Sequence, residues 1–100
     1  MRGNKLERPM AIYMITYDLH PPKGENYERL FTALEAVGIG YWDCLDSTWL
    51  VITEKTAIEI RDELKQYLKD GDRLLVVRCG QGAAWLGFKD DCHTWLEDKL

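Results

Sequence analysis

The sequence predicts an α+β fold in which four strands and two helices follow one another in the order β-α-β-β-α-β. Short apolar runs rich in β-branched and aromatic residues, typical of buried strands, surround two segments whose apolar residues recur every three or four positions. The chain has 100 residues, 46% of them hydrophobic, which is enough for one core and too little for two. We therefore expect one domain over residues 10–88, a flexible leader over 1–9 and a C-terminal tail over 89–100.

The first strand and the first helix are separated by a clear break. Residues 10–17, MAIYMITY, form an uninterrupted apolar run, which predicts a buried strand. The chain is then broken by Pro21, Pro22 and Gly24. From Asn26 onward, the spacing predicts a helix whose apolar face is Tyr27, Leu30, Phe31, Leu34 and Val37. Gly38 follows it and is expected to end the helix as a left-handed cap.

A hairpin is expected next. Residues 41–45 and 48–53 read as two strands, and the tight-turn pair Asp46-Ser47 lies between them. The second strand leads directly toward the start of another helix.

The second helix has a recognisable beginning. Thr56 and Glu59 are spaced as a capping box, in which each side chain accepts a hydrogen bond from a free amide of the first turn. The helix is expected to stop at Asp70-Gly71. Its buried face is predicted to be Ile60, Leu64, Tyr67 and Leu68.

The C-terminal third supplies a fourth long strand over 73–79 and, after a glycine-rich turn, a short fifth strand over 83–88, AAWLGF. The tail over 89–100 can form a small amphipathic helix that places Trp95 and Leu96 on the domain. With right-handed crossovers and short connections, this order predicts the ferredoxin-like sandwich, an antiparallel sheet with two helices on one face.

Both faces of the sheet are predicted to be apolar. Residues 11–17 present apolar side chains alternately on each face, and so does the strand over 73–79, yet two helices cover one face only. Burying a side chain of this size is worth roughly 1.5–3 kcal/mol, so the second face should find a cover. We expect a homodimer to supply it, since two-fold dimers are the commonest oligomers; the C-terminal segment folding back is the alternative.

The cysteines and charges limit the possible functions. The chain has three cysteines, Cys44, Cys79 and Cys92, an odd number without C-x-x-C spacing, which predicts reduced buried thiols. The adjacent Cys92-His93 pair alone is insufficient for a metal site. With a net charge of −4 and no basic cluster in the domain, the chain is poorly suited to long duplex DNA. No apolar run is long enough for a membrane span, and the N-terminus, MRGNKLERP, lacks the apolar segment of a signal peptide. We therefore expect a cytoplasmic protein without membrane partners.

In the predicted topology, chemically capable side chains gather at one edge of the sheet, where the first strand ends and its two neighbours begin. This edge collects Asp18, His20, Asp46, Ser47, Thr48, Asp72 and Arg73. The carboxylates could hold a hard cation such as Mg²⁺, the arginine could bind phosphate, and the histidine could exchange protons.

Each of these residues also has a purely structural interpretation. Asp18 could end a strand, His20 could be an exposed loop residue, and Asp46-Ser47 could be only a turn. Trp42, Trp49 and Trp85 are more typical of a core or a dimer interface than of platforms for stacked bases.

Three short motifs give the chain a resemblance to a known family. A strand ending in Tyr-Asp-Leu (17–19), a Leu-Asp-Ser-Thr-Trp stretch (45–49) and a Gly-Asp-Arg-Leu lead into a strand (71–74) occur in this order over roughly residues 10–88. In this the chain resembles the small CRISPR-associated adaptation proteins, the second core member of that system, and most of all their SinR-like relatives of unassigned role.

The resemblance implies a ferredoxin-like homodimer in which the fifth strand joins the partner's sheet. It also implies that Asp18 corresponds to the aspartate linked to magnesium-dependent nuclease activity, shared across the dimer, and Ser47 to a serine at the start of the third strand. Related toxins on the same scaffold are ribonucleases. The chain departs from the family where arginines are usual, since it has His20-Pro-Pro and Lys89-Asp-Asp there.

Three functional hypotheses follow from these observations. The first is a homodimeric binding module for a nucleotide, a short nucleic acid or a protein partner, with His20, Asp46, Ser47, Thr48 and Arg73 as binding residues. The second is a Mg²⁺-dependent endonuclease or ribonuclease with Asp18 as catalytic and metal-binding residue. The third is an interaction protein that regulates a defence or toxin system.

Overall fold

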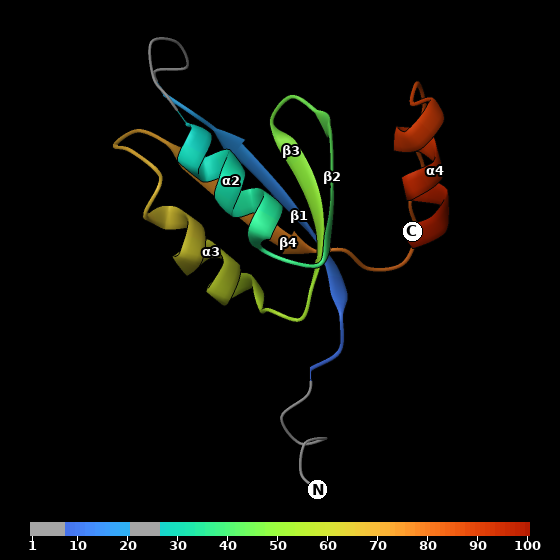
Figure 1. Cartoon of the computed structure of the whole chain (residues 1–100), viewed down its shortest axis with the longest axis horizontal. Helices are drawn as coiled ribbons and strands as arrows, with labels where there is room; N and C mark the ends of the chain where they lie inside the picture. The colour runs from blue at the N-terminus through green and yellow to red at the C-terminus, as the bar shows by residue number, and fades with distance from the viewer. Residues whose placement is uncertain (1–7, 21–26) are drawn as a thin grey trace, which may run out of the picture.

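The computed structural model describes residues 8–20 and 27–100, so the expectations for residues 1–7 and for the Pro21–Gly24 break lie outside it. Its elements are β1 (Ala11–Asp18), α2 (Glu28–Ala36), β2 (Gly40–Leu45), β3 (Thr48–Thr53), α3 (Ala57–Lys65), β4 (Arg73–Arg78) and α4 (Asp90–Lys99) (Figure 1). This confirms the α+β class and the expected order of the elements. No helix among the described residues is long and apolar enough to cross a membrane.

The four strands form one antiparallel sheet in the order β2-β3-β1-β4. β1 lies between β3 and β4, with Thr16 opposite Thr48 and Asp18 opposite Arg73. β2 and β4 are therefore the edge strands of the described sheet. The register places the end of β1 beside the beginning of both of its neighbours, as the sequence predicts.

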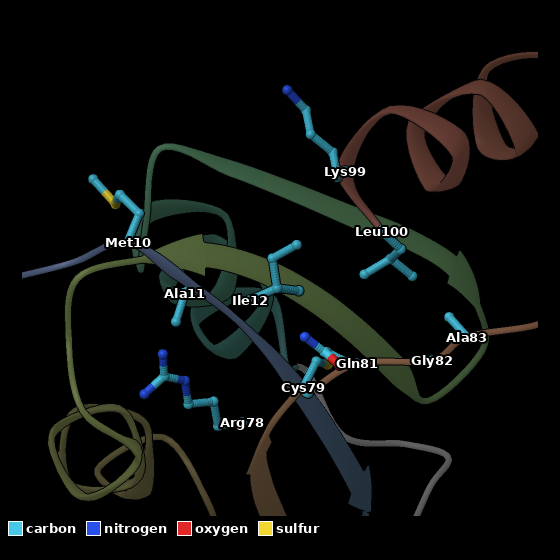
Figure 2. Close-up of a pocket in the computed structure, with 11 residues that line it drawn as sticks. Met10, Ala11, Ile12, Arg78, Cys79, Gln81, Gly82, Ala83, Lys99 and Leu100 are labelled. Carbon is cyan, nitrogen blue, oxygen red and sulfur yellow. The ribbon is translucent and has the colours of Figure 1, made fainter.

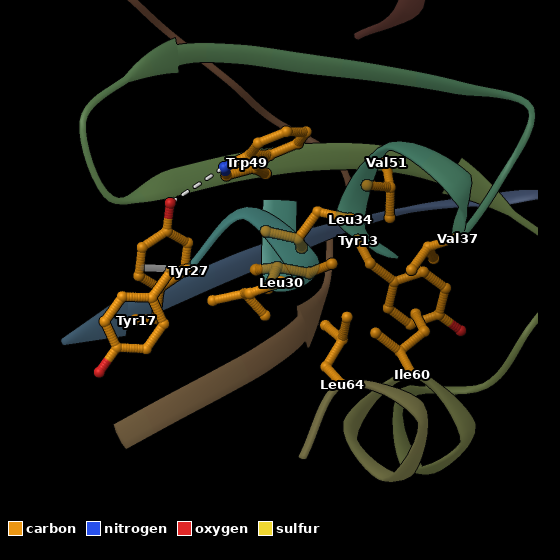
Figure 3. Packing of buried hydrophobic residues seen from close by; sticks show 11 residues of the cluster. Tyr13, Tyr17, Tyr27, Leu30, Leu34, Val37, Trp49, Val51, Ile60 and Leu64 are labelled. Carbon is orange, nitrogen blue, oxygen red and sulfur yellow. Dashed lines mark hydrogen bonds between the residues drawn. The ribbon is translucent and has the colours of Figure 1, made fainter. Parts of the chain in front are cut away.

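The main core lies between the sheet and the two helices α2 and α3, which cover the same face (Figures 1 and 3). Alternate side chains of β1 enter this core, and Leu30, Leu34, Ile60 and Leu64 of the helices are fully buried. The remaining buried members of this cluster are Tyr13, Ile15, Tyr17, Tyr27, Val37, Trp49 and Val51. Trp49 is thus a core residue, in agreement with its structural interpretation.

The second face of the sheet is covered by the chain itself over β2 and β3. Trp42, Leu50 and Leu96 form a second buried cluster there, with Trp85, Phe88 and Trp95 packed against it. In Figure 1, α4 lies on the side of the sheet opposite α2 and α3. Of the two covers considered from the sequence, the folded-back C-terminal segment is the one seen on this part of the sheet.

The expected fifth strand does not form in the single chain, and this prediction is wrong for the isolated protomer. Residues 83–88 pair with no strand among the described residues. Gly82 and Gly87 adopt positive φ angles of 89° and 94°, which turn the chain away from the sheet direction. As a result, Trp85 and Phe88 pack onto the second face instead of extending an edge.

Part of the second face stays open at β4. Leu75 and Val77 alternate onto that face and retain 55% and 41% exposure, because α4 lies over β2 and β3. This leaves an unpaired edge strand with apolar side chains next to it.

The expectation of three reduced thiols is wrong for two of them. Cys44 on β2 and Cys92 on α4 form a disulfide with a Cα–Cα distance of 6.2 Å, and Cys79 is the free cysteine of the described chain. The two positions are 48 residues apart in sequence. Only the folding of α4 back onto β2 brings them together, so their spacing gives no sign of the pairing.

Two helix boundaries differ from those expected. Gly38 is no left-handed cap: α2 ends at Ala36 with Val37 as its cap, and a Cβ added at Gly38 would lie 1.9 Å from the Ile52 carbonyl oxygen. A glycine is needed there because another strand passes so close. α3 ends at Lys65, five residues before the expected stop at Asp70, yet Tyr67 and Leu68 still pack against the core. The predicted capping box at the start of α3, Thr56 with Glu59, is confirmed.

Candidate functional site

Asp18 and Arg73 form the centre of the predicted edge. They are direct partners across the β1–β4 ladder, so their side chains leave the sheet on the same face. Both side chains are exposed and line a shallow pocket of about 210 Å³ with Thr16 and Leu75. Within residues 8–20 and 27–100, the Asp18 side chain makes no hydrogen bond or ion pair. An exposed carboxylate and a guanidinium therefore share one small pocket.

The start of β3 is fastened to the end of β1 beside this pocket. The Thr16 hydroxyl lies 3.1 Å from the Thr48 hydroxyl and donates to the Ser47 carbonyl oxygen, also at 3.1 Å. The Tyr17 backbone amide donates to the same carbonyl oxygen at 3.1 Å. Ser47 and Thr48 are thus brought to the predicted edge, and these bonds fix the β2–β3 turn against β1.

His20, two residues after Asp18, is hydrogen-bonded to Asp72, which directly precedes Arg73. The His20 backbone amide donates to Asp72 Oδ1 at 2.6 Å, the Lys69 amide donates to Oδ2 at 2.7 Å, and the Tyr27 hydroxyl lies 3.1 Å from Oδ2. Burial opposes ionisation of this carboxyl group, but these hydrogen bonds outweigh it and lower the pKa of Asp72 below its usual value. Asp72 therefore joins three segments of the chain.

Asp46 lies on the helix-covered side of the sheet, away from the Asp18–Arg73 pocket. Its carbonyl oxygen is 3.5 Å from the Tyr17 hydroxyl, and its residue lines a hollow that Glu35 and Asp43 share. Sequence reasoning did not single out Glu35 or Asp43, because the contact between α2 and the β2–β3 hairpin is invisible in the spacing of either segment. The predicted edge is thus divided between the two faces of the sheet.

The described residues contain no group of three His, Cys, Asp or Glu side chains placed to hold one metal ion. A cation at Asp18 would take its other ligands from outside those residues or from a second copy of the chain. At the Cys92-His93 pair, Cys92 is bonded to Cys44, while His93 Nδ1 accepts a hydrogen bond from Trp85 at 3.1 Å.

A further hollow of about 420 Å³ lies at the opposite end of β1, beside the glycine-rich turn after β4 (Figure 2). Arg78 and Lys99 contribute its positive charges. In Figure 2, the Lys99 side chain extends away from both Arg78 and the turn, so the two cations do not converge on one point.

No family model matches the chain, and no solved structure matches it. The resemblance to the CRISPR-associated adaptation proteins therefore stays a prediction from the three sequence motifs.

Proposed function

We propose that the chain is a ferredoxin-like homodimer that works as a binding module, with its ligand at the edge where Asp18 meets Arg73. The ligand class is a nucleotide, a short nucleic acid or a protein segment that presents an anionic group. Arg73 supplies a donor fork for a phosphate or carboxylate, and Asp18 accepts hydrogen bonds from hydroxyl or amino groups. The observation that carries the proposal is this exposed pair of opposite charges in one pocket beside the open edge of β4.

The size of the pocket connects ligand binding with dimer formation. Small-molecule sites usually measure about 300–1,000 Å³, whereas this pocket holds about 210 Å³. One protomer can therefore accommodate a single phosphate-sized group. A second protomer placed along β4 would enlarge the pocket and would cover Leu75 and Val77, which are exposed in the single chain.

The open edge of β4 is the surface proposed for the second copy. An unpaired edge strand offers free amide and carbonyl groups, and apolar side chains next to it add burial energy. The resemblance implies that residues 83–88 of the partner would pair there, and Leu86 within that segment is 94% exposed. Pairing would require this segment to leave its position on its own sheet.

Sedimentation velocity tests the dimer. We expect the purified chain to sediment as a dimer at micromolar concentration, and the double variant Leu75→Lys with Val77→Lys to sediment as a monomer. Ile39→Lys is the matched control, because Ile39 is an exposed apolar residue just before β2, at the opposite edge of the sheet. A monomeric wild-type protein would refute the dimer.

Thermal shift measurements test the ligand site. A ligand that binds only the folded state raises the melting temperature, so a panel of nucleotides and short oligonucleotides should contain at least one stabilising compound. Arg73→Ala should abolish that shift. Arg78→Ala, at the other end of β4, should leave it intact, because Arg78 is also exposed but lies away from the pocket. A panel without any shift would count against the binding module.

A Mg²⁺-dependent nuclease is the second candidate, because the exposed Asp18 carboxylate is not engaged by any described residue. Cleavage of labelled RNA or DNA that requires Mg²⁺ and is abolished by Asp18→Ala, with folding and sedimentation unchanged, would establish it. If no substrate is cleaved, this function is excluded.

We propose the cytoplasm as the compartment, although the Cys44–Cys92 disulfide argues for an oxidising one. Alkylating the thiols at the moment of cell lysis, followed by mass spectrometry, decides between the two. Modification of all three cysteines would support the cytoplasm, and modification of Cys79 alone would support an oxidising compartment.

A further inference from the structure

The helix-covered side of the molecule carries a hollow that the Asp18–Arg73 edge does not use. It measures about 390 Å³ and lies between α2 and the β2–β3 hairpin. Three aromatic residues, Tyr17, Phe31 and Trp49, contribute to its lining. Its size suits one large side chain rather than a single ion.

The aromatic rings of this hollow are held in place. The Trp49 indole nitrogen donates to the Tyr17 hydroxyl at 3.1 Å, and both residues are buried in the main core. The Phe31 ring lies 6.4 Å from that of Tyr17, and the Tyr41 ring lies 5.2 Å from that of Trp49. Phe31 and Tyr41 keep 37% and 40% exposure. Tyr17 and Trp49 are thus the buried base of the hollow, and Phe31 and Tyr41 are the rings that reach solvent.

The charged residues around these rings are all acidic. Glu35 from α2, Asp43 from β2 and Asp46 from the turn line the same hollow, and none of the residues that line it is a lysine or arginine. In the described part of the chain, no side chain neutralises these three carboxylates. Burial raises the pKa of Tyr17, and the negative charges of Asp43 and Asp46 raise it further, which agrees with their closeness to this ring.

This combination selects a particular kind of cation. The three carboxylates are not grouped closely enough to hold a metal ion, and they would repel a phosphate. A guanidinium group is flat, stacks on aromatic rings, is weakly hydrated and offers several N–H donors to separate carboxylates. Arginine therefore matches both the rings and the acids, whereas lysine matches the charge alone.

We propose that this hollow binds an arginine side chain of a basic protein partner, with the guanidinium stacked on the exposed Phe31 ring and bonded to Asp43 and Asp46. Glu35 adds long-range attraction from α2. The chain's net charge of −4 favours the approach of such a partner. The proposal concerns a different surface from the Asp18–Arg73 edge and does not depend on the function proposed there.

Nuclear magnetic resonance with a defined peptide tests the proposal. The probe is a capped hexapeptide of alternating arginine and serine, compared with the same peptide carrying neutral citrulline in place of arginine. We expect the arginine peptide to shift the Trp49 indole N–H signal, while the indole signals of Trp42 and Trp85 stay in place. The citrulline peptide should bind at least about fivefold more weakly, as expected for the loss of several exposed charge contacts.

Two pairs of matched variants locate the binding. Asp43→Asn combined with Asp46→Asn should weaken arginine-peptide binding by about fivefold or more. Asp91→Asn combined with Asp98→Asn, which removes two exposed carboxylates of α4, should not change it. Phe31→Ala should weaken binding, and Ile58→Ala should not. Unchanged melting temperatures establish that the variants remain folded.

Three outcomes would overturn the proposal. The first is equal binding of the arginine and citrulline peptides, and the second is equal weakening by the hollow and control variants, which would indicate general charge attraction. The third is a hollow closed by a second copy of the chain, seen as loss of the dimer in the Phe31→Ala variant. The first two results bear on neither the ligand panel nor Arg73→Ala, and the third would also contradict the dimer along β4 without deciding the ligand panel. This proposal and the ligand site can therefore fail separately.

Discussion

Among single residues, Asp72 connects more of the molecule than any predicted site residue. Its carboxylate accepts hydrogen bonds from the segment after β1, from the start of α2 and from the turn before β4. The sequence places Asp72 at the functional edge, but the structure gives its carboxylate a mainly structural task. Arg73, its neighbour, remains exposed and available.

Asp72→Asn should destabilise the protein in a pH-dependent manner. Because the folded-state pKa of Asp72 is lowered, its carboxylate stabilises the fold above the unfolded pKa of about 3.9, and this contribution is lost as the pH falls through the folded value. We expect a loss of about 1–2 kcal/mol in the free energy of unfolding at pH 7, which disappears once the pH falls below the folded-state pKa of Asp72. Urea denaturation at several pH values measures it. Asp70→Asn is the control, and equal losses in both variants would contradict the assignment.

Gly38→Ala should be strongly destabilising for steric reasons. The added Cβ would lie 1.9 Å from the Ile52 carbonyl oxygen, which also accepts the Ile39 amide. Relieving that contact moves a buried strand, and we expect a cost of about 2–4 kcal/mol. Gly80→Ala meets open space and should cost little by comparison. Equal melting temperatures for the two variants would refute this explanation of Gly38.

Among the elements, α3 has the start that the sequence predicts most clearly, through the Thr56–Glu59 capping box. The Thr56 hydroxyl accepts from the Glu59 amide at 3.1 Å, and the Glu59 carboxylate accepts from the Thr56 amide at 2.9 Å. Arg8 also pairs with this carboxylate, and the hydrogen bond from Arg8 is the main reason that the pKa of Glu59 falls to about 2. The helix therefore begins at a fixed position.

Thr56→Ala removes half of this capping box. We expect it to lower the free energy of unfolding by about 1 kcal/mol, as is usual for the loss of a helix N-cap. Thermal denaturation measures the change. Thr94→Ala, at an exposed position inside α4, should have no destabilising effect, since alanine is the better helix former there. A Thr56→Ala variant as stable as the wild type would show that the cap contributes nothing.

At the scale of the whole molecule, the sheet has two differently covered faces. One is covered by α2 and α3. The other is covered over β2 and β3 by α4 and the segment before it, which the Cys44–Cys92 disulfide ties to β2, and stays open at β4. The Trp42 indole adds a hydrogen bond to the Cys92 carbonyl oxygen at 3.0 Å. The disulfide is thus the covalent link that holds α4 over the second face.

Reducing the disulfide should loosen α4 while the main core stays folded. A crosslink across 48 residues stabilises by up to about 4 kcal/mol in the loop-entropy model. Hydrogen exchange should accelerate in residues 90–99 of the reduced protein and remain slow in α2. The paired variant Cys44→Ser with Cys92→Ser should behave like reduced protein, and Cys79→Ser like the oxidised one. Unchanged exchange in α4 after reduction would contradict this role.

The sequence by itself determined the α+β class, the order of the elements and the capping box of α3, because periodicity, caps and turns are local signals. It also determined that Asp18 lies near Arg73, because the antiparallel pairing of the strands follows from the order of the elements. Only the tertiary structure decided which part of the chain covers the second face, that Cys44 pairs with Cys92, and that Asp46 lies in a hollow with Glu35 and Asp43. These contacts join segments distant in sequence. They depend on where α4 and the hairpin pack, and local residue patterns carry no information about that.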